Sequence, residues 1–441
     1  MNNSTKNSTE NFFIIVPPSF EELALKEITF KWPLIIDLFS RLNNLPNESE
    51  YVENIKTMEK QIQIEKQIEQ IYGGLLISLP ENMGYLLNPI LKIPTRILMR
   101  LTSFKCRDFP KLYNKIRKFP WNKYLKGQLP SIEASAEKSR LHHTGRIIET
   151  TKEAILNYYQ GQPPSKKSLE EVKEINIENF SIYIRFENDI CTVSIDTSGE
   201  ALYKRSYKKF VNEAPLRENL ASGLLLKLNE FIDFPEGEGK MLIDPMTGSG
   251  TFIIEAALFN TLNFTREYSF TLFPCFKKYI SNYQTLQTLQ TLHSSADDQL
   301  HHLQYQKYLA IDIDDKTITS TSKNFELLKS LNLNSIPIKL IKADVFEMSY
   351  VNLEPLKKVI IVNPPYGIRI KLELKFKNKV NFFQKLITTL LDNFKPNIIG
   401  IIVPRDISYK QFKLPTNILS LSVFPFIHGG LKLNFIIYKV I

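Results

Sequence analysis

A chain of 441 residues is too long for one ordinary domain, and its length alone predicts two or three. Lysine and arginine number 56 against 46 aspartates and glutamates, and the resulting net charge of +10 favours nucleic acid or another polyanion as a partner. The three cysteines lie far apart and form no CxxC pair, which argues against a disulfide framework and a cysteine zinc site.

In chain order, the polar start "MNNSTKNSTE" lacks the apolar core of a signal peptide, and no apolar run approaches the ~20 residues of a membrane span. We therefore expect a cytoplasmic protein without a membrane segment. Next, "FFIIVPPSFEELALKEI" predicts a strand, a Pro-Pro break and a helix whose capping box pairs Ser19 with Glu22. The charged residues 45–70 indicate an exposed helix or insertion, and "GGLLISLP" predicts another strand, so this part is α+β in character.

Residues 106–200 form another mixed block, which ends in an apolar alternation over 180–195 that predicts a β-hairpin. From Pro215 the pattern changes to an amphipathic helix, and strands and helices then alternate. We predict strands at "MLID", "YLAIDID", "IKLIKAD", "VIIVNPP" and "IIGIIVP", with helices from about 251, over 316–330 and over 381–394. This alternation is typical of a doubly wound parallel sheet, and two apolar runs near 418–425 and 433–439 predict an antiparallel pair at its edge.

Residues 274–306 interrupt this alternation. They contain the short repeat "TLQTLQTLH" and are rich in glutamine and histidine, so we expect a loop insertion without a chemical role. His293, His301 and His302 lie there with two aspartates between them. A polar loop rarely holds ligands in a fixed tetrahedral set, so no metal site is expected.

The first motif that could support chemistry is "MLIDPMTGSGT", in which Gly248, Ser249 and Gly250 join a strand to a helix. Glycines suit a sharp turn that a ligand must touch, and the start of a helix offers free N–H groups. Ile253 stands where a dinucleotide fingerprint needs a third glycine, and no G-K-[ST] follows. Both a dinucleotide site and a phosphate-binding P-loop are therefore disfavoured, and a simple tight turn is the alternative.

Polar groups also end the next strands. Asp312 lies where a carboxylate can accept hydrogen bonds from ribose hydroxyls, and Asp344 could accept one from an adenine amino group. Each could instead be a helix cap, as we expect for Asp314 and Asp315. In "VIIVNPPYG", Pro364 must stop the strand because proline cannot donate to a sheet ladder. An amide, two rigid carbonyls and an aromatic ring therefore lie at a strand end.

The ordered set "DPMTGSGT", "AIDID", "KADVF" and "NPPYG" resembles the class I S-adenosylmethionine-dependent methyltransferases that modify exocyclic amino groups. The resemblance implies an α/β fold whose Rossmann-like domain has a seven-stranded, mostly parallel sheet and binds S-adenosylmethionine. The implied cofactor-binding residues are Asp244, Pro245, Thr247, Gly248, Ser249, Gly250, Asp312 and Asp344, with the glycines near the methionine part, Asp312 at the ribose and Asp344 at the adenine. The implied catalytic residues are Asn363, Pro364, Pro365 and Tyr366.

These residue types suit the chemistry. An exocyclic amine conjugated to a base is a poor nucleophile, because its lone pair is delocalised into the ring. If the Asn363 side-chain oxygen and the Pro364 carbonyl accept its two N–H groups, a more tetrahedral nitrogen and its developing positive charge are favoured. Tyr366 could stack on a base taken out of its helix. The alternative is a strand end with a proline turn and one surface aromatic.

Another resemblance covers most of the chain. The stretches "SIDTSGEALYKRSYKKF" and "APLRENLASGLL" resemble the signature of THUMP-containing RNA guanine-N2 methyltransferases, although Tyr203, Ser206 and Lys208 replace the usual histidine, glycine and arginine. Upstream, "LYNKIRKFPWNKYL" and "SAEKSRLHHTGRI" are similar to the THUMP segment of that family. The resemblance implies a ferredoxin-like region at 11–105 with a charged insertion, a THUMP RNA-binding domain at 106–200, a basic linker at 201–213 and a methyltransferase domain at 214–441.

Two basic stretches could contact RNA. In "KLYNKIRKFPWNKYLKG" lysines alternate with aromatics, but we favour the interpretation that Phe119 and Trp121 are core and the lysines a solvated face. The stretch "KRSYKK" is the better candidate because it joins the two halves of the chain. Its predicted RNA-binding residues are Lys204, Arg205, Lys208 and Lys209.

The sequence therefore predicts an enzyme that methylates the exocyclic N2 amine of a guanosine in structured RNA, with 23S large-subunit ribosomal RNA or its precursor as the leading substrate. The choice of guanine rests on the THUMP resemblance, because NPPY alone does not identify the amine. The alternatives are a tRNA guanine-N2 methyltransferase, an adenine-N6 methyltransferase and an inactive RNA-binding ribosome-assembly factor. The last is disfavoured, since an inactive site would not need Asn363, Gly248 and Asp312 together.

Overall fold

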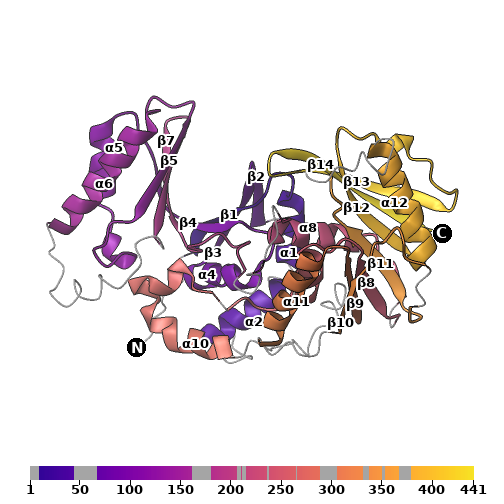
Figure 1. Ribbon diagram of the computed structural model, residues 1–441. Coiled ribbons are helices and arrows are strands. Elements are labelled where there is room, and N and C mark those ends of the chain that lie inside the picture. Colours follow the sequence, from indigo (N-terminus) through magenta and orange to yellow (C-terminus); the bar gives the residue numbers. More distant parts are fainter. Residues whose placement is uncertain are drawn as a thin grey trace. The chain divides into compact units, whose positions relative to one another are not determined.

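The computed structural model forms two compact units, each considered by itself (Figure 1). It describes residues 9–43, 67–160, 180–205, 210, 215–235, 238–264, 266–288, 305–330, 337–349, 353–366 and 379–441. The first unit comprises Met1–Pro17, Ala24–Leu202 and Asn263–Gln290, and the second comprises Pro18–Leu23, Tyr203–Leu262 and Thr291–Ile441. In the described part, no helix is both long and apolar enough to cross a membrane.

Among its described residues, the first unit has a seven-stranded sheet in the order β2-β3-β1-β4-β7-β6-β5. Its strands are β1 (Thr9–Ile15), β2 (Ile68–Ile71), β3 (Gly74–Pro80), β4 (Arg96–Lys105), β5 (Ser131–Glu137), β6 (Ser181–Glu187) and β7 (Ile190–Asp196). β4 pairs with β1 through Arg96–Arg100 and with β7 through Leu98–Lys105. The predicted ferredoxin-like and THUMP regions therefore share one sheet, and the expected boundary after residue 105 does not separate compact units.

Side chains of this sheet alternate between two faces, as the pleat requires. Phe12 and Ile14 are fully buried, whereas Phe13 and Ile15 are only half-buried. The helices of the unit are α2 (Trp32–Leu42), α4 (Glu81–Ile90), α5 (Phe109–Arg117), α6 (Thr144–Gln160) and α10 (Ile280–Thr288), and α1 (Glu21–Phe30) begins in the second unit. Figure 1 shows α5 and α6 side by side. The predicted hairpin is confirmed as β6–β7.

Three local expectations can be compared with the first unit. Ser19 is not an N-cap, because it lies in a turn with φ of 76° rather than in extended backbone, and α1 begins at Glu21. Trp121 is fully buried, which confirms the interpretation that it belongs to the core. The turn of the β6–β7 hairpin has φ of 51° at Asn188 and 64° at Asp189, and these values are typical of the type I′ turn that joins twisted strands.

The expected loop over 274–306 needs correction for its first half. Residues Pro274–Tyr279 form a 3-10 helix that leads into α10. Phe276 and Tyr283 are buried there, and their rings pack edge-on against Phe270 with centroids 4.9 and 5.4 Å away. Burial of these aromatics explains why a segment of otherwise polar composition is ordered. The histidines at 293, 301 and 302 lie outside the described residues.

The second unit contains the predicted doubly wound sheet. In the described residues its order is β10-β9-β8-β11-β12-β14-β13, and the first five strands are parallel. The antiparallel β14 and β13 complete the sheet, which confirms the edge pair. The strands are β8 (Lys240–Asp244), β9 (Lys307–Asp312), β10 (Ile338–Lys342), β11 (Lys357–Val362), β12 (Ile398–Pro404), β13 (Ile418–His428) and β14 (Leu431–Val440), and the helices are α8 (Glu218–Asn229), α9 (Thr251–Ala257), α11 (Asp315–Ser330) and α12 (Lys379–Phe394).

The strand order of the second unit's sheet predicts where a ligand would bind. β12 is buried along its whole length, and α12 contributes Leu386 and Leu390 to the same apolar core as Ile360 and Ile401. Strand order reverses between the neighbouring strands β8 and β11. Ligands of open α/β sheets bind outside the carboxyl ends of the strands at such a reversal, and the predicted motifs follow those ends.

Candidate functional site

The turn between β8 and α9 depends on two glycines. Gly248 has φ of 54° and Gly250 has φ of 81°, both in the left-handed region that other residues avoid. A Cβ on Gly250 would lie 3.0 Å from Thr321 and 3.1 Å from Phe325, both on α11. A Cβ on Gly248 would meet nothing within 4 Å. Gly250 therefore serves close packing, whereas Gly248 borders open space.

Hydrogen bonds join this glycine loop to the end of β9. The backbone N–H of Gly248 donates to Asp312 Oδ2 at 2.9 Å, and Asp312 Oδ1 accepts from the N–H of Asp314 at 3.1 Å. Burial raises the pKa of Asp312, while these backbone donors act to lower it. Asp314 caps α11, because its carboxylate accepts from the N–H of Thr317 at 2.8 Å. The structure thus brings Asp312 and the glycine loop together, and Asp314 is a cap as expected.

Two further groups of the loop are buried. Asp244, at the end of β8, is 2% exposed, and burial raises its pKa to about 8, with a further contribution from the negative charge of Asp312. Its carboxyl accepts the N–H of Met246 at 3.3 Å. The hydroxyl of Ser249 is also buried, and no residue in the described part of the chain forms a hydrogen bond with it. Such an unsatisfied polar atom is costly, and a polar ligand at the loop would relieve that cost.

Asp344 follows β10 and is held near the end of β9. Its Oδ1 accepts the N–H of Phe346 at 3.0 Å. The N–H of Ala343 donates to the backbone oxygen of Asp312 at 2.9 Å. This hydrogen bond links the carboxyl ends of β9 and β10, where Asp312 and Asp344 lie. Asn393 on α12 donates to the backbone oxygen of Val345 at 3.0 Å and holds the same turn.

The NPPY motif directly follows β11, next to the strand that carries the glycine loop. Pro364 is buried, while Asn363, Pro365 and Tyr366 are half-buried. The hydroxyl of Tyr366 donates a hydrogen bond to Asn363 Oδ1. Burial raises the pKa of Tyr366, so this hydroxyl remains a donor at neutral pH. The amide oxygen predicted to accept a substrate amine therefore already has a partner within the motif.

The basic segment over 204–209, which we predicted to bind RNA, contains both an exposed and a buried cation. Lys204 is exposed, but Arg205 is buried, with its guanidinium 3.4 Å from the carboxylate of Glu255 on α9. Ser222 donates to that same carboxylate at 2.5 Å. Arg205 is therefore a buried ion-pair residue and not a surface contact, which corrects the expectation. Lys208 and Lys209 lie outside the described residues.

Asn324 on α11 is a residue that sequence reasoning missed. It is fully buried and holds Phe210 through two hydrogen bonds: its Oδ1 accepts the Phe210 N–H at 3.0 Å, and its Nδ2 donates to the Phe210 oxygen at 2.7 Å. Nδ2 also lies 3.2 Å from the backbone oxygen of Ser249. One side chain thus links the end of the basic segment to the glycine loop. An asparagine inside a helix, where its propensity is low, was the available signal.

Ile313 was also missed. It follows Asp312 directly, and the residue is 59% exposed. An exposed isoleucine between two acidic residues in "AIDID" is unusual for a strand end. It places an exposed apolar side chain directly after the carboxylate of Asp312.

The "DTSG" part of the signature serves the fold of the first unit. Asp196 is fully buried and pairs with Arg96, and burial raises its pKa to about 6 while Arg96 opposes that rise. Ser198 Oγ donates to Asn88 Oδ1 on α4 at 2.7 Å. Arg266 donates to the backbone oxygens that follow, at residues 200 and 201. These contacts join the end of β7 to β4, to α4 and to the part of the first unit that begins at Asn263.

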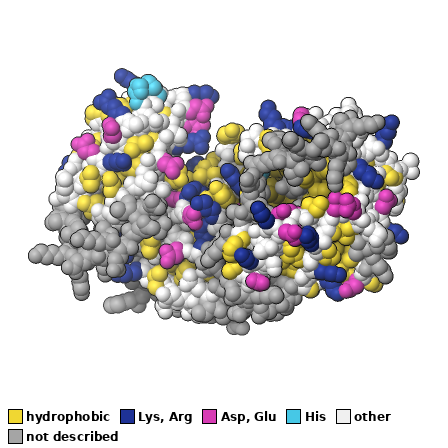
Figure 2. All heavy atoms as spheres, viewed as in Figure 1, with side chains coloured by type: hydrophobic (Ala, Val, Ile, Leu, Met, Phe, Trp, Pro, Cys, Tyr) yellow, Lys and Arg dark blue, Asp and Glu magenta, His cyan; other side chains and the backbone are white. Residues whose placement is uncertain are grey.

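A second basic surface lies at the start of α6. Arg140, His142, His143 and Arg146 are exposed, and the Arg146 guanidinium stacks over the ring of Phe109 at 4.2 Å. Figure 2 shows the histidine side chains beside lysine or arginine side chains. These residues belong to the stretch "SAEKSRLHHTGRI", for which the sequence showed a similarity to the THUMP segment.

Comparison with known proteins finds that the chain is similar to methyltransferases, chiefly over the second unit. A family model described as "RMKL-like, methyltransferase domain" matches residues 205–412. The ribosomal RNA large subunit methyltransferase K/L of Marinomonas sp. is 30% identical over 202 residues, which cover 45% of this chain and 25% of that protein. A candidate RNA methyltransferase of Synechocystis sp., slr0064, is 24% identical over 381 residues, or 85% of this chain and 91% of that protein.

The crystal structure of SMU.472, complexed with SAH, has a TM-score of 0.67 and 20% identity to this chain, with 98% of this chain and 99% of that chain covered. At that identity the likeness concerns the fold. The match to the large subunit methyltransferase K/L proteins spans only part of their length, from 23% to 44% in four of them.

Proposed function

We propose, from the match of residues 205–412 to the RMKL-like methyltransferase model, that the chain transfers a methyl group from S-adenosylmethionine to the exocyclic N2 amine of a guanosine in large-subunit ribosomal RNA. The observation that carries the proposal is the junction of β8 and β11. There the glycine loop follows β8 and the half-buried Asn363 follows β11, while Asp312, at the end of the neighbouring β9, accepts a hydrogen bond from Gly248.

The residues fit this cofactor. When bound, S-adenosylmethionine supplies a methyl group on a positively charged sulfur. Gly248 borders open space, so the backbone there can approach the methionine part. The buried hydroxyl of Ser249 would gain a polar partner. Asp312 would accept the ribose hydroxyls, Asp344 the adenine amino group, and the exposed Ile313 would pack on the adenine ring.

The NPPY residues would then act on the amine. Asn363 Oδ1 and the Pro364 carbonyl accept its two N–H groups, which favours the tetrahedral nitrogen that attacks. Pro364 and Pro365 keep that carbonyl in place, because proline fixes its own φ. The half-buried ring of Tyr366 would stack on the base once the base has left its helix.

The RNA and its guanine are supported by different observations. The net charge of +10, the exposed Lys204 and the basic surface at the start of α6 suit phosphates. The THUMP-like signature supports a structured RNA and guanine N2. The names of the K/L relatives support large-subunit ribosomal RNA. We propose that the first unit is the RNA-binding part of the enzyme.

A nucleoside analysis tests this function. Ribosomal RNA from a strain that lacks this protein should lose N2-methylguanosine at one site, and the purified protein with S-adenosylmethionine should restore it. Loss of N6-methyladenosine instead would assign the enzyme to adenine. Binding of RNA by a protein that neither binds S-adenosylmethionine nor transfers methyl groups would make it an assembly factor.

A further inference from the structure

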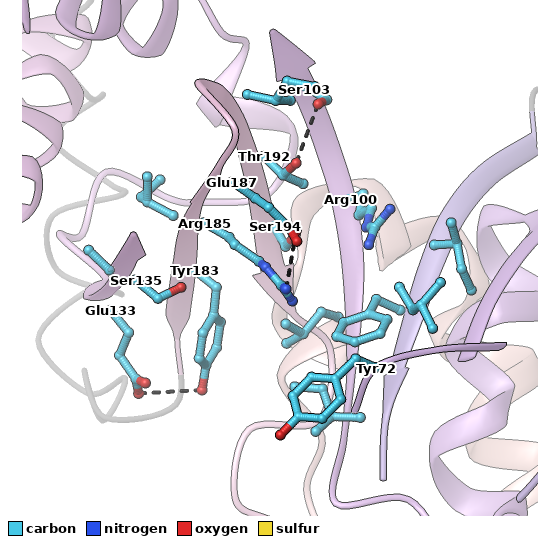
Figure 3. A pocket seen from close by; sticks show the side chains of 18 of the residues that line it. Tyr72, Arg100, Ser103, Glu133, Ser135, Tyr183, Arg185, Glu187, Thr192 and Ser194 are labelled. Atoms are coloured by element: carbon cyan, nitrogen blue, oxygen red, sulfur yellow. Dashed lines mark hydrogen bonds and ion pairs between the residues drawn. The ribbon is translucent and has the colours of Figure 1, made fainter. Parts of the chain in front are cut away.

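A groove of about 620 Å³ crosses the open face of the first unit's sheet (Figure 3). Its lining comes from strands across the sheet, from β2 at one edge to β5 at the other. The half-buried Phe13 and Ile15 face it, while the opposite face of β1 holds the buried core. All residues that line the groove belong to the first unit, and none of them is a residue of the proposed methyl-transfer site.

Strand register aligns the polar residues of the groove in one row. Arg100 on β4 lies opposite Ser194 on β7, which lies opposite Tyr183 on β6, which in turn lies opposite Glu133 on β5. The β4–β7 register shifts between Arg100 and Thr102. Such a bulge increases the local twist of a sheet and redirects nearby side chains, and bulges are common beside functional sites.

Two guanidinium groups line this groove. Arg100 lies over the ring of Phe13 at 5.3 Å, and within the described chain it has no ion-pair partner. Arg185 is 3.2 Å from Glu187, which is exposed. Burial and the positive charge of Arg185 lower the pKa of Arg100, while the negative charges of Glu69 and Glu187 act to raise it. Bringing an anion into the groove near Arg100 would relieve this repulsion.

Aromatic rings line the same groove. Tyr72, in the turn between β2 and β3, is 90% exposed, which is unusual for so large a side chain. Tyr183 is half-buried, and its hydroxyl donates to Glu133 at 3.3 Å. This hydrogen bond restrains the orientation of the ring. Accessible aromatic rings beside arginines on an open sheet face are the elements with which proteins stack unpaired bases and hold the phosphates between them.

We infer that this groove binds unpaired nucleotides of the RNA substrate, with a phosphate at Arg100 and Arg185 and bases stacked on Tyr72 and Tyr183. The inference rests on the proposed function, because it assigns part of the same RNA to this face. Three glutamates also line the groove, at positions 69, 133 and 187. Their charges disfavour a continuous phosphate backbone, but carboxylates accept N–H groups of exposed bases. The groove therefore favours a single strand over a duplex.

Binding of a fluorescein-labelled oligouridylate, followed by fluorescence anisotropy, tests the groove. Tyr72→Ala and Arg100→Ala should each weaken binding about tenfold, since stacking and charge contacts of this kind are worth that much. Tyr72→Ala removes an exposed side chain, so folding is preserved. Arg41→Ala is the matched control, because Arg41 is a half-exposed arginine on α2, paired with Asp37, and does not line the groove. Wild-type binding by both groove variants overturns the inference.

Photo-crosslinking separates this inference from the proposed function. An oligonucleotide that carries 5-iodouridine should crosslink to peptides containing Tyr72 or Tyr183, and excess RNA duplex should compete poorly. Crosslinks confined to other peptides, or better competition by the duplex, would refute the groove. Methyl transfer and S-adenosylmethionine binding are measured in parallel. A protein that crosslinks through the groove yet transfers no methyl group refutes the proposed function and leaves the groove in place.

Discussion

The hydroxyl of Tyr366 donates a hydrogen bond to the side-chain oxygen of Asn363, the atom that we propose accepts an N–H group of the substrate amine. The hydroxyl remains protonated because burial raises its pKa. The amine must therefore share this oxygen with Tyr366 or displace it. Tyr366 thus has two separable parts, a ring that can stack on a base and a hydroxyl that keeps Asn363 occupied before substrate binds.

Tyr366→Phe separates these parts, because it keeps the ring and removes the hydroxyl. A neutral hydrogen bond contributes about 0.5–1.5 kcal/mol. Without the Tyr366 hydroxyl, the substrate amine no longer competes for the Asn363 oxygen, so the KM for RNA should fall roughly 2- to 10-fold at similar kcat. Steady-state kinetics with ribosomal RNA from the deletion strain would measure this. A lower kcat at unchanged KM would instead mean that the hydroxyl positions Asn363 for catalysis.

Asn363→Ala should abolish most methyl transfer. Removal of one preoriented charge-stabilising group typically costs about 100- to 1,000-fold in kcat. Affinities for S-adenosylmethionine and RNA should stay near the wild-type values, as measured by calorimetry and filter binding. Asn397→Ala is the matched control, because Asn397 accepts the backbone N–H of Lys358 at 2.9 Å at the amino end of β11. It should lower thermal stability and leave kcat intact. Full activity of Asn363→Ala would exclude the proposed mechanism.

The two glycines should respond differently to alanine. Both substitutions place a side chain in the left-handed region, which costs about 1–2 kcal/mol of unfolding free energy. Gly250→Ala should lose more stability, because its Cβ would lie 3.0 Å from Thr321. Gly248→Ala has open space around its Cβ and should lose cofactor affinity beyond its loss of stability. Urea denaturation and calorimetry measure the two quantities, and equal S-adenosylmethionine affinities in both variants would contradict the assignment of Gly248.

Lys204 and Arg205 are adjacent in sequence but should have opposite effects. Arg205→Ala removes the partner of the buried Glu255 and should lower the unfolding free energy by about 3–5 kcal/mol. Lys204 is exposed, so Lys204→Ala should weaken RNA binding and leave the melting temperature unchanged. Weaker RNA binding by a stably folded Arg205→Ala protein would restore the original expectation for Arg205.

The sequence predicted the parallel part of the second sheet well because its strands are short apolar runs, and β8, β9, β10 and β11 are each followed by a recognisable motif. The "VIIVNPP" run ends where Pro364 stops β11, and the glycine loop follows β8 as expected. Burial was harder to predict. Arg205 looked like a surface cation because its partner Glu255 is 50 residues away in sequence.

Neither the groove nor the helical structure of residues 274–288 could be predicted from local sequence patterns. The row from Arg100 to Glu133 depends on the register of four strands, and register is a property of the folded sheet. In 274–288 the helical order depends on packing of Phe276 and Tyr283 with Phe270, which composition does not reveal.

Asp244 should give the protein a characteristic dependence of stability on pH. Its pKa is raised to about 8 in the fold, against an ordinary value near 4 in the unfolded chain. The folded protein therefore binds this proton more tightly, so the contribution of Asp244 to stability is complete below pH ~4 and is lost as pH rises to about 8.

Asp244→Asn removes this titration while it keeps a neutral side chain of the same size. In the absence of cofactor, the melting temperature of the wild type should fall relative to that of the variant between pH 5 and pH 9, on the order of several degrees. Asp196, whose pKa is raised to about 6, titrates in both proteins and cancels from the difference. If the melting temperatures of the two proteins change with pH in parallel across this range, then Asp244 is already ionised at pH 5. Other interactions would then offset the cost of burying its charge.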